Sequence, residues 1–182
     1  MIDQDTRTEQ RREGCVHNYT GKGKGKTTAA LGLCLRAVGA GYRVYIGQFM
    51  KAGDYSELKA LKRLGDRVTV EQFGTGRFVR GTPSEADRQK AREGFQTALA
   101  ALKGGGYQMV ILDECMIALH QGLLSLAQLQ SLIDLRPTGV ELVLTGRHAP
   151  SEIIAQADLV TDMHEVKHYF RKGIKARTGI EK

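Results

Sequence analysis

The chain has 182 residues, of which 41% are hydrophobic and 26% charged, a composition typical of one globular domain with a substantial core. No apolar run reaches the roughly 18 residues that span a bilayer, and the N-terminus lacks the apolar stretch of a signal peptide, so we expect a cytoplasmic protein without a membrane segment. The net charge of +7 would attract a polyanion, and because only 6% of the residues are aromatic, a small polyphosphate is favoured over nucleic acid.

Strands and helices are predicted to alternate along the chain. Residues 1–13 are polar and charged and are expected to form a flexible N-terminal arm, followed by a single domain over residues 14–182. Short apolar runs predict strands, and apolar residues three or four apart predict helices. The predicted strands are 15–19, 43–49, 68–73, 108–113, 140–145 and 159–162, and the predicted helices are 27–38, 56–64, 84–103, 126–135 and 150–157.

This alternation predicts an α/β fold of the P-loop NTPase-like (RecA-like) type, with a mostly parallel sheet and helices on both faces. Segments 108–113 and 140–145 are apolar on both faces, as buried parallel strands are. The helix at 84–103 should begin at Ser84, because Asp87 stands three residues later, as in a capping box. The basic tail after Met163 is expected to be irregular.

Residues 19–28 read Tyr-Thr-Gly-Lys-Gly-Lys-Gly-Lys-Thr-Thr, between a predicted strand and a predicted helix, which is the context of a Walker A phosphate loop. The glycines let backbone N–H groups turn toward phosphate oxygens, and the helix N-terminus adds its positive end. Lys26 would supply a point charge and Thr27 a hydroxyl for Mg²⁺. The general pattern has glycine where this chain has Thr20. The residues expected to bind ATP here are Thr20, Gly21, Lys22, Gly23, Lys24, Gly25, Lys26, Thr27 and Thr28.

A second motif lies at 109–114, where the buried strand Met-Val-Ile-Leu-Asp-Glu ends in two carboxylates, as a Walker B strand does. Asp113 would hold a Mg²⁺-bound water beside Thr27. Glu114 would be a hydrolytic base in an ATPase or a metal ligand in a transferase. The two motifs together predict ATP and Mg²⁺, but they leave the reaction open between a RecA-like ATPase that moves on nucleic acid, a small-molecule kinase and another transferase.

Further segments narrow this choice. Residues 20–30 read Thr-Gly-Lys-Gly-Lys-Gly-Lys-Thr-Thr-Ala-Ala, and this segment resembles the P-loop ATP:corrinoid adenosyltransferases of the CobA/BtuR type. The resemblance continues in order along most of the chain, through Gln-Phe-Met-Lys, Gly-Thr-Gly-Arg-Phe, Leu-Asp-Glu and Thr-Gly-Arg. These and the remaining similar segments lie at 48–51, 74–78, 112–114, 145–147, 157–158, 166–168, 173–176 and 179–181.

The resemblance implies a reaction in which a corrinoid reduced to Co(I) attacks the 5′ carbon of ATP and inorganic triphosphate leaves. It implies that ATP lies reversed along the phosphate loop, and that Lys26, Thr27 and Glu114 form the catalytic set, with Thr27 and Glu114 binding Mg²⁺ and Asp113 acting through water. Lys24 and Arg147 would add positive charge around the triphosphate. It also implies a homodimer and a reduced flavoprotein as electron donor, with no nucleic acid partner.

On the corrinoid side, the resemblance implies that the loop at 76–79 meets the corrin ring. Some members carry Trp in this loop, whereas this chain has no Trp and its nearest aromatic residue is Phe78, which is therefore the expected corrinoid contact. A non-catalytic corrinoid carrier is a further alternative. The intact set of Lys26, Thr27 and Asp113 favours the enzyme, because a carrier needs no complete Mg·ATP site.

Overall fold

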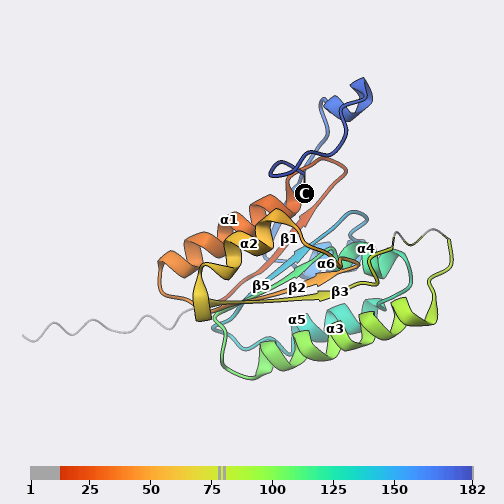
Figure 1. Ribbon diagram of the computed structural model, residues 1–182. Coiled ribbons are helices and arrows are strands. Elements are labelled where there is room, and N and C mark those ends of the chain that lie inside the picture. The colour runs from red at the N-terminus through yellow and green to blue at the C-terminus, as the bar shows by residue number, and fades with distance from the viewer. Residues whose placement is uncertain (1–12, 78, 80, 182) are drawn as a thin grey trace, which may run out of the picture.

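The computed structural model describes residues 13–77, 79 and 81–181 (Figure 1). Within these residues, six strands form one sheet in the order β3-β2-β4-β5-β1-β6, and every neighbouring pair is parallel. The strands are β1 (Val16–Thr20), β2 (Val44–Phe49), β3 (Val68–Phe73), β4 (Met109–Asp113), β5 (Glu141–Thr145) and β6 (Leu159–Asp162). The predicted α/β fold is confirmed, and the sheet is parallel throughout.

Helices cover both faces of the sheet, as predicted (Figure 1). One face packs against α1 (Lys26–Gly39) and α2 (Ser56–Lys62), and the apolar cluster beneath them includes Cys34, Ile46 and Val143. The other face packs against the remaining helices and has its own apolar cluster, which includes Phe49 and Leu144. These helices are α3 (Glu85–Lys103), α4 (Cys115–His120), α5 (Leu126–Asp134) and α6 (Ser151–Gln156).

The predicted elements agree with the structure to within one or two residues at most ends. The capping box at the start of α3 is present, with Ser84 accepting from the Asp87 backbone and Asp87 accepting from the Ser84 backbone. The predicted helix at 56–64 is shorter and is followed by a 3-10 turn, η1 (Gly65–Arg67). Helix α4 was not predicted, because six residues directly after a strand give no periodicity to read.

Beyond β6, the tail extends away from the sheet, past the N-terminal end of α1 (Figure 1). It contains a single 3-10 turn, η2 (Tyr169–Lys172), and is otherwise irregular over its described length, as predicted. Of the predicted N-terminal arm at 1–13, all but Glu13 lies outside the described residues. None of the described helices combines the length and apolar character that a membrane crossing requires.

Candidate active site

The two predicted nucleotide motifs meet at the carboxyl edge of the sheet. The strand order places the segments that follow the strands side by side there, with Lys51 after β2, Asp113 at the end of β4, Arg147 after β5 and the phosphate loop after β1. In open parallel sheets, ligands bind outside the carboxyl ends of the strands. The topology therefore gathers residues far apart in the sequence into one candidate site.

The phosphate loop turns sharply between β1 and α1 and packs against the residues that follow β6. Gly21 and Gly25 have positive φ angles of 95° and 120°, which glycine adopts without steric cost. The Gly23 amide donates to the Met163 carbonyl at 2.6 Å, and a Cβ on Gly23 would lie 2.5 Å from that oxygen. Thr20 is the last residue of β1 and pairs with Asp162 in the sheet. A side chain fits there because the position belongs to the strand and needs no glycine.

Lys26, the first residue of α1, is 6% exposed and lies across the loop. Its ammonium donates to the carbonyls of Gly21 and Gly23, each at 2.7 Å. Burial lowers the pKa of Lys26, although nearby carboxylates partly oppose the shift. The side chain is thus a buried cation inside the phosphate loop, as the Walker A motif predicts.

Asp113 is the polar centre of the site and is 1% exposed. Its Oδ1 accepts from the hydroxyls of Thr27 and Thr145, both at 2.8 Å. Its Oδ2 accepts from the Lys51 ammonium at 2.8 Å and from the Gln48 amide at 3.4 Å. Buried carboxylates are stable only when paired and hydrogen-bonded, and these four donors, from three separate segments, meet that need.

Glu114 follows in the left-handed conformation, with φ 58°, and caps α4. Its amide donates to the Thr145 hydroxyl at 3.0 Å, while its carboxylate lines the cavity and has no hydrogen-bond partner among the described residues. Burial and the neighbouring Asp113 raise the pKa of Glu114, and Lys51, Lys26 and Arg147 partly offset the rise. An unpartnered carboxylate facing a cavity is free to bind a cation.

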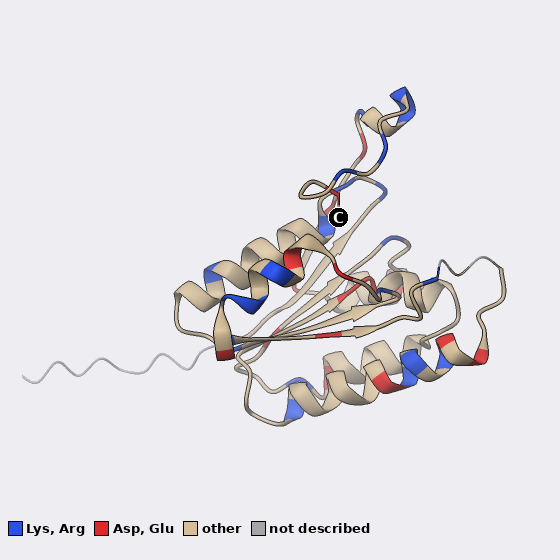
Figure 2. Ribbon diagram, in the orientation of Figure 1, with Lys and Arg blue, Asp and Glu red and all other residues tan. Residues whose placement is uncertain are grey.

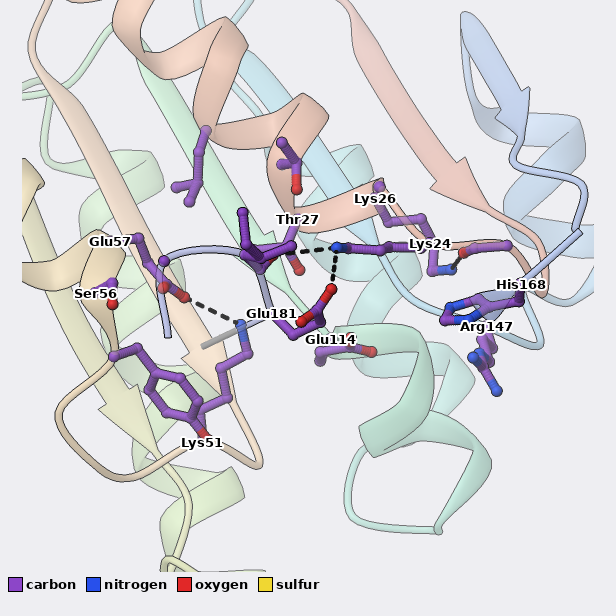
Figure 3. A pocket seen from close by; sticks show the side chains of 17 residues that line it. Lys24, Lys26, Thr27, Lys51, Ser56, Glu57, Glu114, Arg147, His168 and Glu181 are labelled. Carbon is purple, nitrogen blue, oxygen red and sulfur yellow. Dashed lines mark hydrogen bonds and ion pairs between the residues drawn. The ribbon is translucent and has the colours of Figure 1, made fainter. Parts of the chain in front are cut away.

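The residues around this point enclose a cavity of about 660 Å³ (Figure 3), within the size range of small-molecule sites. Residues 23–28 of the phosphate loop line it, whereas Thr20, Gly21 and Lys22 do not. Arg147 and Glu114 line it from the ends of β5 and β4. Phe78, expected on the corrinoid side, lies outside the described residues.

The tail forms a wall of the cavity that the sequence did not predict. The Lys24 ammonium donates to the Glu181 carboxylate at 2.8 Å, to the Tyr169 hydroxyl at 2.9 Å and to the Ile180 carbonyl at 3.1 Å. Arg177 binds the same carboxylate, and its Nη2 lies 3.1 Å from Glu181 Oε1. Figure 2 shows basic residues along the tail and at the adjacent phosphate loop. Lys24 is therefore bound to the tail at one edge of the cavity.

Lys51 is the second residue whose contacts the sequence did not predict. The sequence left open whether Lys51, in the Gln-Phe-Met-Lys segment, reaches a phosphate or a corrin amide or stays in solvent. In the structure its side chain lines the cavity and its ammonium pairs with Asp113. The available signal was its position two residues beyond the end of a predicted buried strand, where parallel sheets place their functional side chains.

Comparison with known proteins identifies the family. The model of the family "ATP:corrinoid adenosyltransferase BtuR/CobO/CobP" matches residues 12–181. The corrinoid adenosyltransferase of Pseudomonas aeruginosa is 34% identical over 182 residues, covering 100% of this chain and 90% of that protein. The corrinoid adenosyltransferase of Escherichia coli is 35% identical over 182 residues, covering 99% and 91%.

A solved structure supports the fold independently. A KaiC-like protein from Pyrococcus horikoshii superimposes with a TM-score of 0.52 at 20% identity, covering 82% of this chain and 73% of that chain. At that identity the likeness shows the P-loop fold alone. The match to the family model and the full-length relatives go further, and they establish that this chain belongs to the ATP:corrinoid adenosyltransferase family.

Proposed function

We propose that this corrinoid adenosyltransferase, which transfers the adenosyl group of ATP to a corrinoid, works by direct attack of Co(I) on the 5′ carbon of ATP with release of intact triphosphate. The observation that carries the proposal is the 2.8 Å hydrogen bond from Thr27, which lines the cavity, to Asp113, which joins the phosphate loop to the acidic end of β4. Family membership selects adenosyl transfer among the reactions that such a site supports.

In this reaction the electron pair of Co(I) forms the cobalt–carbon bond, and the pair of the C5′–O bond leaves on the triphosphate. No proton is transferred, so the site needs no general base. It needs alignment of the two reactants and positive charge around the leaving group. Lys26, the amides of residues 24–28 and Arg147 supply that charge and hold the phosphates.

Mg²⁺ would be held by Thr27 and Glu114, with Asp113 acting through water. The residues fit this ion, because the Thr27 hydroxyl is bonded to the buried Asp113 carboxylate, and the adjacent Glu114 carboxylate lines the same cavity as Thr27. No group of three or more His, Cys, Asp or Glu side chains converges as a metal site within the described part of the chain, and Mg²⁺ bound with a nucleotide usually takes only one or two carboxylates. When bound, the ion would neutralise phosphate charge.

The corrinoid would lie over the loop at 76–79, with Phe78 as its aromatic contact. A reduced flavoprotein would supply the electron that converts Co(II) to Co(I), and two copies of the chain, each a single domain over 14–182, would form a homodimer. The resemblance of the 74–78 segment to the family supports the first of these points, and family precedent supports the others.

Product analysis tests the proposal. The protein is mixed with Mg·ATP and chemically reduced cob(I)alamin, without oxygen and in the dark, and the corrinoid spectrum and the phosphate products are followed. We expect a light-sensitive alkylcorrinoid and an equal amount of inorganic triphosphate. Unchanged corrinoid with ADP or orthophosphate would contradict the proposal and favour the ATPase or kinase. A Lys26→Ala variant serves as the inactive control.

A further inference from the structure

Lys51 is a half-buried cation on the wall of the cavity. Its side chain is 17% exposed, and its ammonium lies 2.8 Å from Asp113 Oδ2 and 3.8 Å from Glu57 Oε1. The Tyr55 ring lies below it, with the ring centre 5.5 Å away. The two carboxylates favour the cationic side chain, and of its three N–H donors one is used by Asp113 among the described residues.

The backbone holds Lys51 in this position. Met50 has a positive φ of 59°, and its amide donates to the Phe73 carbonyl at 3.1 Å. A Cβ on Gly74 would lie 2.6 Å from the backbone nitrogen of Lys51, so the two backbones are in contact. The segment that carries Lys51 thus packs on Gly74, which lies two residues before the loop at 76–79.

Lys51 is more than the counter-ion that Asp113 needs. Asp113 already accepts from the hydroxyls of Thr27 and Thr145 and from the amide of Gln48. Removing a lysine ammonium from water costs free energy unless nearby anions stabilise its charge. This cation lines the cavity from the β2 side, where it could bind an anionic ligand.

The strand order shows where along a bound triphosphate this cation would act. Lys26 belongs to the β1 side of the site and Lys51 to the β2 side, with the end of β4, which carries Asp113 and Glu114, between them. Figure 3 shows Lys51 with Glu57 on one side of Thr27 and Glu114, and Lys26 on the other. A triphosphate held by Lys26 across the Mg²⁺ position would therefore end near Lys51.

The geometry of the reaction determines which end of the triphosphate, the α- or the γ-phosphate, lies near Lys51. This step rests on the proposed function, in which the corrinoid approaches over the loop at 76–79. The 5′ carbon must face the corrinoid, and the oxygen bonded to that carbon must lie beside it. Gly74 leads into this loop, and its backbone packs on the Lys51 backbone. The leaving oxygen would therefore lie at the Lys51 end of the cavity.

We infer that Lys51 is a further catalytic residue, whose ammonium stabilises the negative charge that forms on the α-phosphate ester oxygen as the C5′–O bond breaks. Asp113 and Glu57 hold the ammonium in place. The electron pair of the broken bond goes to the triphosphate, cobalt provides the pair for the new bond, and Lys51 keeps all its protons. A cation placed beforehand where charge develops is the arrangement that accelerates such a step.

The test compares Lys51→Met and Lys51→Arg with wild type, using pre-reduced cob(I)alamin so that cobalt reduction does not limit the rate. ATP affinity is measured separately by calorimetry. We expect Lys51→Met to lower kcat by about 100-fold or more, as loss of one charge-stabilising donor does, while the Kd for ATP changes by less than about 5-fold. Lys51→Arg should keep a larger part of the rate. Lys59→Met, which removes an exposed lysine paired with Asp54, is the matched control and should behave as wild type.

A second substrate separates catalysis from structure. In an ATP analogue with sulfur in place of the 5′ bridging oxygen, the leaving atom needs less stabilisation, so the kcat defect of Lys51→Met should shrink to less than about 10-fold. A defect of equal size with both substrates, a kcat close to wild type, or a loss of ATP binding that accounts for the lost rate would each overturn the inference. A wild-type protein that makes no alkylcorrinoid in the same assay would instead contradict the proposed function.

Discussion

The two sides of the cavity are built in different ways. On the sheet side, Asp113 is 1% exposed and is bound by donors that strands and the start of α1 fix in place. On the tail side, Lys24 and Glu181 pair at 2.8 Å, but the Lys24 side chain is 39% exposed, and the tail has only a four-residue 3-10 turn in its described length. One side is part of the core, and the other is a chain segment laid against it.

Because of this difference, losing a contact on the sheet side costs more free energy than losing one on the tail side. A buried polar group that loses a partner costs about 1–3 kcal/mol, whereas an exposed ion pair contributes about 0.2–1 kcal/mol. Arg177, Lys24 and Tyr169 hold the pKa of Glu181 well below its usual range, so the tail contact keeps its charge across the neutral range. We expect the sheet side to be preformed and the tail side to open and close.

The largest effect should come from Lys26→Ala, on the rigid side. The variant removes a buried cation from the phosphate loop, so ATP affinity should fall by on the order of 100-fold. Calorimetric titration with Mg·ATP measures it. Lys103→Ala, an exposed residue at the end of α3, is the control. Unchanged affinity in Lys26→Ala would remove the loop from the triphosphate site.

Thr145→Val should give the next effect, on stability. The change removes one of two hydroxyls from Asp113 Oδ1 and leaves the Glu114 amide without its partner. We expect a loss of about 2 kcal/mol and a fall in Tm of roughly 4–8 °C, measured by thermal unfolding. Thr138→Val, at an exposed position, should change stability by less than about 0.5 kcal/mol. Similar effects of the two variants would show that Asp113 does not depend on this hydroxyl.

Glu181→Gln should change the tail and leave the core intact. The tail loses the charge pairs with Lys24 and Arg177, so amide exchange over 169–181 should rise while Tm changes little, because exposed ion pairs contribute little to global stability. Glu165→Gln, which breaks a pair with Arg171 in the same tail, is the matched control. The account fails if the two variants loosen residues 179–181 equally.

The smallest effect at neutral pH concerns Cys34, which lies fully buried in α1. Burial raises its pKa from 9.0 to about 11. Because the unfolded thiol ionises first, the folded state binds more protons between these values, so Cys34 makes stability fall as pH rises from 9 to 11. Comparing denaturant unfolding of wild type and Cys34→Ala at several pH values measures this. Identical pH dependence of the two proteins would contradict it.

The elements and motifs that the sequence predicted depend on residues close together in the chain. Six strands, the capping box at Ser84 and both Walker motifs are local patterns of this kind. The contacts that were missed join distant residues, since Lys51 and Asp113 are 62 positions apart and Lys24 and Glu181 are 157 apart. No spacing or periodicity records such pairs, because the fold brings them together. The resemblance to the family named the reaction, but it could not say which lysines face the cavity.

The central claim, that the bond broken is C5′–O, can be tested with one isotope experiment. ATP carrying oxygen-18 in the 5′ bridging position is converted with cob(I)alamin, and the phosphate products are analysed by mass spectrometry. We expect all of the label in inorganic triphosphate, because the ester oxygen leaves with the phosphates. Label retained on the adenosine portion would mean that a P–O bond is broken, which would contradict adenosyl transfer at this site.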